Sequence, residues 1–186
     1  MTAQKQLWEI AMDQHGYVTT SDARSLGVTP AALKLLAHRG VLRNEGYGVY
    51  RFSLFPASAA DDYQHAVLRT GKPGAALSHE TALDVLDLCD VNPDRIHVTV
   101  PRAARVRRQG GDQLSLHQQD LGTDEVGWWE GVRCVTEATA IMQVIDARST
   151  PMHLIRQAID TARSHGRISP SAAEHFSKKL ERDIGT

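Results

Sequence analysis

Cationic side chains recur between Lys34 and Arg51, at positions that a helix and a following hairpin would leave exposed. Leu33, Leu36 and Ala37 fall on one helical face, so the charged side chains between them point elsewhere. Lysine and arginine neutralise phosphate oxygens, and arginine can also pair with the edge of a base. These residue types therefore predict contact with a nucleic acid, and the alternative is an ordinary solvated surface.

The same stretch carries start and stop signals for a helix followed by two short strands. Thr29 can act as an N-cap, and Pro30 suits the first helical position. Gly40 stops the helix, and extended runs at residues 41–43 and 49–52 follow, joined by a turn that contains two glycines. A capped helix followed directly by a basic hairpin is the arrangement of the recognition helix and wing in a winged helix-turn-helix domain.

The residues before this helix supply the remaining elements of such a domain. Apolar spacing predicts a helix over residues 3–14, followed by a short extended link at 17–18. Thr20 or Ser21 is expected to cap a second helix, Asp22–Leu26, which ends at a glycine turn. Two helices separated by a short turn match the helix-turn-helix layout. Residues up to Pro56 are therefore predicted to form a DNA-binding domain, 1–56.

Side chains on the exposed faces of this domain are the candidate DNA contacts. They are Thr20, Ser21, Thr29, Ala31, Lys34, Leu35, His38, Arg39, Arg43, Tyr47 and Arg51. Arg43 and Arg51 flank the wing turn, and Tyr47 at its tip could contact a sugar or phosphate or simply cap the turn. A second cationic run contains Arg102, Arg105, Arg107 and Arg108. This run could extend the DNA footprint, bind an acidic protein surface, or be a solvated loop.

The remaining residues, 57–186, are predicted to form a mixed α/β domain with a small sheet and several helices. Alternating β-branched residues predict strands at 96–100, 113–117 and 132–135. Helices are predicted at 58–69, at 75–88, from Thr136 or Thr139 to 147, from 151 to 165, and from 170 onward. Residues 120–130 are interpreted as an acidic loop carrying two tryptophans. The fold class predicted for the whole chain is α+β.

The composition limits the classes of protein to consider. The net charge is −1, so any DNA contact must come from a local basic patch, because non-specific nucleic-acid binders are usually basic overall. No apolar run approaches the ~20 residues that span a bilayer, and the first residues lack the apolar segment of a signal peptide. Cys89 and Cys134 do not make a disulfide framework. These observations predict a cytoplasmic protein with reduced thiols.

No set of catalytic or metal-ligating residues is recognisable from spacing. His79 lies beside Glu80, but the H-E-x-x-H pattern of zinc sites is absent. His97 and His117 are each alone on a predicted strand, so a structural role is expected for these histidines. The aspartates between residues 84 and 94 have no lysine or glutamate on the following strand to complete a nuclease site. We therefore expect no metal, no cofactor and no enzymatic activity.

Several motifs together resemble a known family. Residues 28–51, Leu77–Ala82 (LSHETA), His97–Pro101 (HVTVP) and Gly131–Thr136 (GVRCVT) are similar to segments of AbiEi-like antitoxins from AbiE-type toxin–antitoxin systems. The likeness is strongest over residues 16–52, and mycobacterial members are most similar. The resemblance implies a protein that represses its own operon by binding operator DNA with inverted repeats. It also implies neutralisation of a nucleotidyltransferase-like toxin encoded beside it.

Three hypotheses remain open at this point. The first is an antitoxin and autorepressor, with operator binding in residues 1–56 and neutralisation in 57–186. The second is a stand-alone winged-helix transcription regulator whose C-terminal domain senses a ligand or forms a dimer. The third is a DNA-modifying or DNA-cleaving enzyme with a winged-helix targeting head. A neighbouring toxin gene would favour the first, ligand-dependent DNA affinity the second, and metal-dependent cleavage the third.

Overall fold

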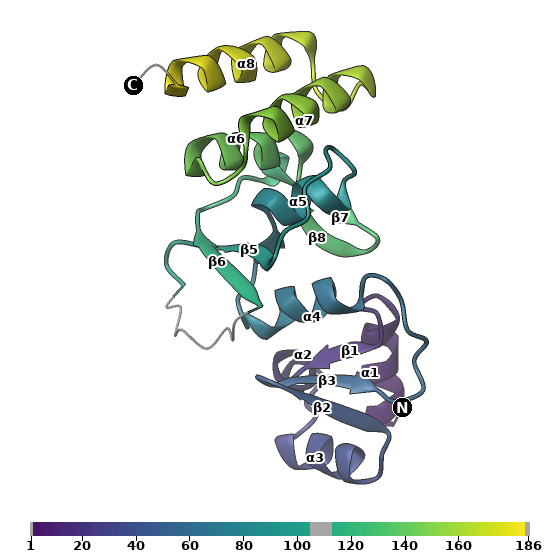
Figure 1. Ribbon diagram of the computed structural model, residues 1–186. Coiled ribbons are helices and arrows are strands. Elements are labelled where there is room, and N and C mark those ends of the chain that lie inside the picture. The colour runs from purple at the N-terminus through teal and green to yellow at the C-terminus, as the bar shows by residue number, and fades with distance from the viewer. Residues whose placement is uncertain (1, 105–112, 185–186) are drawn as a thin grey trace. The chain divides into compact units, whose positions relative to one another are not determined.

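The chain forms two compact units in a computed structural model that describes residues 2–104 and 113–184. The N-terminal unit comprises residues 1–73 together with 130–132, and the C-terminal unit comprises 74–129 and 133–186. Each unit contains helices and a β-sheet of its own (Figure 1). The predicted α+β class is therefore confirmed.

The N-terminal unit is a winged helix-turn-helix, as the sequence predicts. In chain order its elements are α1 (Ala3–Met12), β1 (Tyr17–Thr19), α2 (Thr20–Ser25), α3 (Pro30–His38), β2 (Leu42–Gly46), β3 (Val49–Phe52) and α4 (Asp61–Arg69) (Figure 1). The sheet has the order β1-β3-β2 with antiparallel pairing throughout. The hairpin of β2 and β3 follows α3 directly and forms the wing.

The inner faces of α1, α3 and the sheet meet in one apolar core. Leu7 of α1, Leu33 of α3 and Phe52 of β3 are each at most 3% exposed. Trp8 packs edge-to-face on Phe52, with ring centroids 4.9 Å apart. Burying each large apolar side chain contributes about 1.5–3 kcal/mol, so this core holds α3 firmly against the sheet. Because Leu33 faces inward, the opposite side of α3 faces solvent.

Helix α2 begins earlier than the sequence suggests. Its N-cap is Thr19 rather than Thr20 or Ser21. Thr19 Oγ1 accepts a hydrogen bond from the Asp22 N–H at 3.1 Å, and the Asp22 carboxylate accepts one from the Thr19 N–H at 2.7 Å. This capping box satisfies two backbone donors at once. The prediction was late by one residue or more because three consecutive residues, Thr19 to Ser21, are all good capping residues.

Helix α4 belongs to the compact N-terminal unit, whereas the sequence suggested a boundary after Pro56. An arginine of β3 accounts for the difference. Arg51 Nη2 lies 2.7 Å from Asp61 Oδ2 at the start of α4 and also donates to the Pro56 carbonyl at 2.9 Å. Arg51 Nε donates to the His15 carbonyl at 3.3 Å. These bonds tie α4 to the central strand, and the unit continues to Pro73.

The C-terminal unit is a mixed sheet with helices packed around it. Its elements are β4 (Ala76–Leu77), α5 (His79–Val85), β5 (Ile96–Val100), β6 (Leu114–Gln118), the 3-10 helix η1 (Thr123–Glu125), β7 (Val126–Trp129), β8 (Val132–Val135), α6 (Glu137–Ala147), α7 (Met152–Ser164) and α8 (Pro170–Ile184). The strand order is β6-β5-β4-β8-β7. Strands β5 and β6 run parallel, and β4 pairs antiparallel with β5 and parallel with β8. In the described part of the chain, no helix is long and apolar enough to cross a bilayer.

Two segments of this unit differ from the sequence-based prediction. Residues 75–88 do not form one helix, because Ala76 and Leu77 form the central strand β4 before α5 begins. Leu77 is completely buried and pairs with strands on both sides. The acidic segment 120–130 is not only a loop, because it contains strand β7 at the edge of the sheet. Both strands are short, and their pairing partners are distant in sequence, so local patterning did not reveal them.

Candidate nucleic-acid interface

Helix α3 presents a continuous exposed surface of polar, cationic and small apolar side chains. Thr29 Oγ1 accepts a hydrogen bond from the Ala32 N–H at 3.2 Å, and Pro30 stands at the first helical position, as the sequence predicts. Five candidate contacts are exposed on this helix or at its C-terminal end: Ala31, Lys34, Leu35, His38 and Arg39. We call these five residues the α3 face. Among the described residues, no side-chain hydrogen bond or ion pair occupies them, so they are available to a ligand.

The wing adds two more exposed side chains. The Arg43 side chain is 57% exposed and pairs with Glu45 at 3.2 Å. Exposed ion pairs of this kind contribute little to stability, so Arg43 can exchange its partner for a phosphate. Tyr47 lies at the tip, is 53% exposed and has a left-handed backbone with φ of +53°. The Arg69 guanidinium lies 4.7 Å from the Tyr47 ring centroid and adds a cation to the wing tip.

The remaining candidates of this unit lie near the helix starts. Ser21 and Thr29 are exposed, whereas Thr20 is half-buried beside the wing turn. The Thr20 N–H donates to the Gly48 carbonyl at 2.8 Å. A Cβ at Gly48 would come within 2.8 Å of Thr20 Oγ1, and the backbone there has φ of +75°. The Thr20 backbone therefore holds the wing turn in place, and Thr20 also flanks the proposed surface. Gly48 is required in this turn because a side chain would meet Thr20 and because its φ is positive.

Arg51 is not placed as a DNA contact, which corrects the sequence-based prediction. Its side chain is 6% exposed, its guanidinium is held by Asp61, and it lies 5.3 Å from the Tyr17 ring centroid. Arg51 stands directly opposite Arg43 across the β2–β3 ladder. The two residues look equivalent in the sequence, but α4 packs against β3, and the Arg43 side chain on β2 stays exposed. We therefore exclude Arg51 from the interface.

The second cationic run belongs to the C-terminal part of the chain and lies mostly outside the described residues. Arg102 is exposed, and its backbone N–H donates to Asp120 Oδ1 at 3.0 Å. Arg105, Arg107 and Arg108 lie outside the residues that the structure describes. The three interpretations of this run remain predictions.

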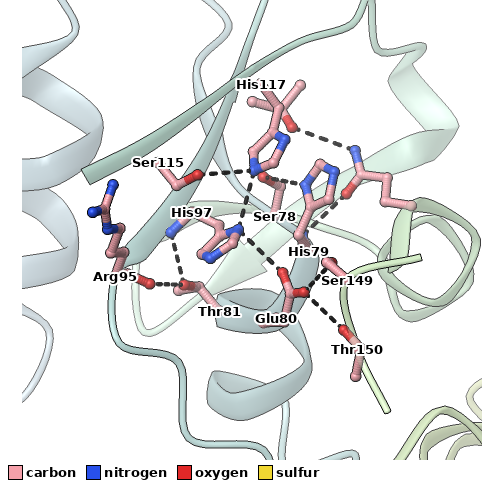
Figure 2. A network of polar contacts seen from close by, with 12 residues as sticks. Ser78, His79, Glu80, Thr81, Arg95, His97, Ser115, His117, Ser149 and Thr150 are labelled. Carbon is pink, nitrogen blue, oxygen red and sulfur yellow. Dashed lines mark hydrogen bonds and ion pairs between the residues drawn. The ribbon is translucent and has the colours of Figure 1, made fainter. Parts of the chain in front are cut away.

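The C-terminal unit contains a network of buried polar side chains that spacing in the sequence does not reveal (Figure 2). The rings of His79 and His117 stack with their centroids 3.5 Å apart and their planes at 17°. His97 Nδ1 lies 3.0 Å from His117 Nε2 and 3.1 Å from Glu80 Oε2. We call these four residues, with Ser149 and Thr150, the histidine network. The expectation that His97 and His117 stand alone is therefore wrong.

Strand pairing brings the histidine network together. Strands β5 and β6 are parallel neighbours, with His97 opposite Ser115 and Thr99 opposite His117. His79 opens α5 one residue after β4 ends, and β4 pairs with β5 on the side away from β6. The His79 backbone is left-handed, with φ of +52°. The sequence places His97 and His117 on predicted strands, but which residues face one another depends on the strand register, which the tertiary fold decides.

Burial keeps the rings of the histidine network neutral. Desolvation, reinforced by neighbouring imidazoles, lowers the pKa of His79 to about 3 and the pKa of His117 to about 4 from the ordinary 6.5. Burial alone would raise the pKa of Glu80, but hydrogen bonds from Ser149 and Thr150 outweigh it and lower this pKa. The network therefore holds a charged carboxylate beside neutral rings.

The geometry of the histidine network favours a structural function over metal binding or nucleophilic chemistry. Within the described residues, no group of three or more histidine, cysteine or acidic side chains is placed to hold a metal ion. The stacked rings of His79 and His117 lie in nearly parallel planes rather than converging on one point. Burial raises the pKa of Cys134 to about 12, so this thiol stays protonated. The network links α5, β5 and β6 to the segment between α6 and α7.

Comparisons with known proteins agree with the geometry of the N-terminal unit. Residues 5–53, which span α1 to β3, match the profile of a family described as "Transcriptional regulator, AbiEi antitoxin". The RV2827C protein from Mycobacterium tuberculosis has a similar fold, with a TM-score of 0.57 and 18% sequence identity, over 98% of this chain and 75% of that chain. No curated protein matches the chain. The family match confirms the resemblance to AbiEi-like antitoxins over residues 5–53.

Proposed function

We propose, with the AbiEi-type regulator domain of residues 5–53 as the premise, that this chain is an antitoxin that also represses its own operon. The N-terminal unit binds inverted repeats in the operator. The C-terminal unit neutralises a nucleotidyltransferase-like toxin encoded beside it. Both activities take place in the cytoplasm, require no cofactor and involve no catalysis by this chain.

The observation that carries the DNA-binding half of the proposal is the α3 face. A helix turned outward from its core, with exposed cations and no partner for them in the described structure, suits entry into the major groove. Arg43 and Tyr47 on the wing lie on the hairpin that follows this helix. Their types suit contact with the phosphate backbone, which positions a protein on the duplex.

The observation that supports a separate neutralising unit is the independent core of the C-terminal unit. Ile141, Ile145 and Ile155 are each at most 2% exposed and are contributed by α6 and α7. A unit with its own core can present a protein interface of the usual size, about 800 Å² per partner. Trp128 on the edge strand β7 is 70% exposed, and exposed aromatic side chains are frequent anchors of protein interfaces.

The DNA-binding half is tested by footprinting on the fragment upstream of the chain's own coding sequence. We expect the full chain to protect two inverted half-sites from cleavage, since winged helix-turn-helix proteins read repeated half-sites. Absence of protection at low salt, with protein shown to be folded by circular dichroism, would contradict the proposal.

The neutralising half is tested by co-expression with the product of the adjacent gene. The full chain should restore growth, and the double variant Lys34→Ala/Arg39→Ala should restore it equally, because both substitutions lie on the α3 face. A double variant that folds but gives no protection would move neutralisation to the N-terminal unit. Failure of the unaltered chain to protect would refute the antitoxin assignment.

A second candidate function is a ligand-responsive regulator without a toxin. A cavity of about 620 Å³ in the C-terminal unit favours it, since this volume is typical of small-molecule sites. His79, His117 and Gln143 are among its lining residues. Under this alternative, DNA affinity should change when a protein-free extract of small metabolites is added. If the DNA affinity stays constant and the chain neutralises the product of the adjacent gene, the ligand-responsive alternative is excluded and the antitoxin assignment remains.

A further inference from the structure

The α3 face contains an apolar row that phosphate contacts do not explain. Ala31 and Leu35 lie one helical turn apart, and both are exposed. Leu35 keeps 47% of its surface exposed although it is a large aliphatic side chain. Aliphatic side chains lose about 0.8 kcal/mol for each methylene that stays in water. An exposed leucine in the middle of a cationic surface therefore suggests an apolar partner.

Core packing does not account for Leu35. The apolar core of the N-terminal unit takes Leu33 of this helix and packs Leu36 and Ala37 against it. Successive helical residues are rotated by about 100°, so Leu35 lies about 200° away from Leu33. Because the inner face is already filled, no rotation of α3 buries Leu35 without exposing Leu33.

The neighbours of this row determine what surface it can meet. Lys34 and His38 form a second exposed row, also one turn apart, and Arg39 follows Leu35 by four residues at the helix end. Lys34 beside this row and Arg39 at its end favour approach to a polyanion and disfavour a purely apolar protein partner. Two apolar residues are also too small an area for a stable protein interface, which needs about 800 Å² on each side.

The major groove of DNA offers one prominent apolar group. Each thymine presents its C5-methyl there, and small or aliphatic side chains contact it, whereas the other base-edge groups are hydrogen-bond donors or acceptors. A helix that enters the groove between phosphate-binding cations places its central residues against the base edges.

We propose that Leu35, together with Ala31, reads the C5-methyl groups of thymines in the operator. The proposal rests on the DNA binding proposed above and adds the base that the helix selects. Lys34 and Arg39 hold α3 in the groove through phosphates, and Leu35 supplies discrimination. The specific half-sites therefore contain thymine at the positions that face the centre of α3.

The experiment uses the fragment upstream of the chain's own coding sequence, amplified once with dTTP and once with dUTP. Uracil pairs as thymine does and lacks only the C5-methyl. Fluorescence anisotropy should show the full chain binding the thymine fragment more tightly, by about fourfold for each methyl contacted, which corresponds to about 0.8 kcal/mol. In Leu35→Ala, the ratio of the two affinities should approach one.

A matched control separates base reading from phosphate binding. Lys34→Ala should weaken binding to both fragments and leave the thymine-to-uracil ratio as in the unaltered chain. Circular dichroism of both variants should be unchanged, because both side chains are exposed. A preference for thymine that survives in Leu35→Ala would arise from DNA shape and would overturn the assignment to this residue.

The two proposals fail in different ways. Equal affinity of the unaltered chain for the thymine and uracil fragments would overturn thymine reading and leave operator binding intact. Binding of neither fragment at low salt would overturn the proposed DNA-binding function itself.

Discussion

The α3 face and the histidine network use polar side chains for opposite purposes. On the α3 face, Lys34, His38 and Arg39 are exposed and have no side-chain partner in the described structure. In the histidine network, Glu80 and His79 are at most 7% exposed and bound to neighbours. Exposed polar groups keep their hydrogen bonds to water and can exchange partners, whereas buried polar groups need protein partners to offset the free-energy cost of desolvation. The first region is suited to ligand binding, and the second holds the fold.

Arg43 and Arg51 show the same difference within a single β-ladder. They are direct cross-strand partners, yet the Arg43 side chain is 57% exposed and that of Arg51 is 6% exposed. The covering helix α4 makes this difference, because it packs on β1 and β3. Residue type alone therefore does not separate a binding residue from a structural one.

The largest expected effect comes from removing the buried arginine. Arg51→Ala should lower the free energy of unfolding of the N-terminal unit by about 3–5 kcal/mol, because it removes the buried cation that pairs with the Asp61 carboxylate. Arg43→Ala, on the opposite strand, should change it by no more than about 0.5 kcal/mol. Urea unfolding followed through the indole N–H signal of Trp8 measures both. Equal effects would remove the distinction between the two arginines.

The next effect is the dependence of stability on pH in the C-terminal unit. The pKa values of about 3 for His79 and about 4 for His117 lie below 6.5. Between these values and pH 6.5, the two histidines are therefore protonated in the unfolded chain and neutral in the folded unit. Stability is full above pH 6.5 and should fall as the pH drops below it, by about 1.4 kcal/mol per pH unit for each histidine. Urea unfolding followed through the indole signals of Trp128 and Trp129 should show this slope between pH 6.5 and 5.

A variant makes the pH prediction specific to the network. His117→Gln removes one of the rings whose pKa is lowered on folding and should make the slope shallower. A slope unchanged by the substitution would assign the pH dependence to other groups.

A smaller loss is expected from neutralising the carboxylate of the histidine network. Glu80→Gln should lower the free energy of unfolding of the C-terminal unit by about 2 kcal/mol, since hydrogen bonds to a charged group contribute about 1.5–3 kcal/mol. The bonds affected are those that the Ser149 and Thr150 hydroxyls donate to Glu80 Oε1. The exposed Glu174→Gln is the matched control and should leave the stability of this unit unaltered. If both substitutions had the same effect, Glu80 would not be a structural anchor.

Substitutions on the α3 face should have the smallest effect on stability, and their effect on DNA binding is the quantity to measure. Lys34→Ala/Arg39→Ala should change stability by no more than about 0.5 kcal/mol. The slope of log affinity against log salt should become shallower by about 0.9 for each phosphate that the variant no longer neutralises. Anisotropy titrations at several salt concentrations measure the slope. An unchanged affinity and slope would exclude this helix from the interface.

The winged helix-turn-helix was predictable because its signals are local. Thr29, Pro30 and the apolar spacing through Leu33 specify α3 within ten residues, and the structure shows the same start and the same inner face. The β2–β3 hairpin likewise follows from a glycine turn between extended runs. The cap of α2 was misplaced, because neighbouring residues offered equally good local chemistry.

The sequence by itself determined which residues form the recognition helix, because a helix is defined by contacts within a few positions. Only the tertiary structure decided which polar residues are buried. Arg51 is enclosed because α4 packs on β3, and His97 meets His117, twenty residues further along the chain, because β5 and β6 pair in parallel. Burial and strand register depend on contacts between distant segments, and such contacts set the local dielectric and the partner of each polar group.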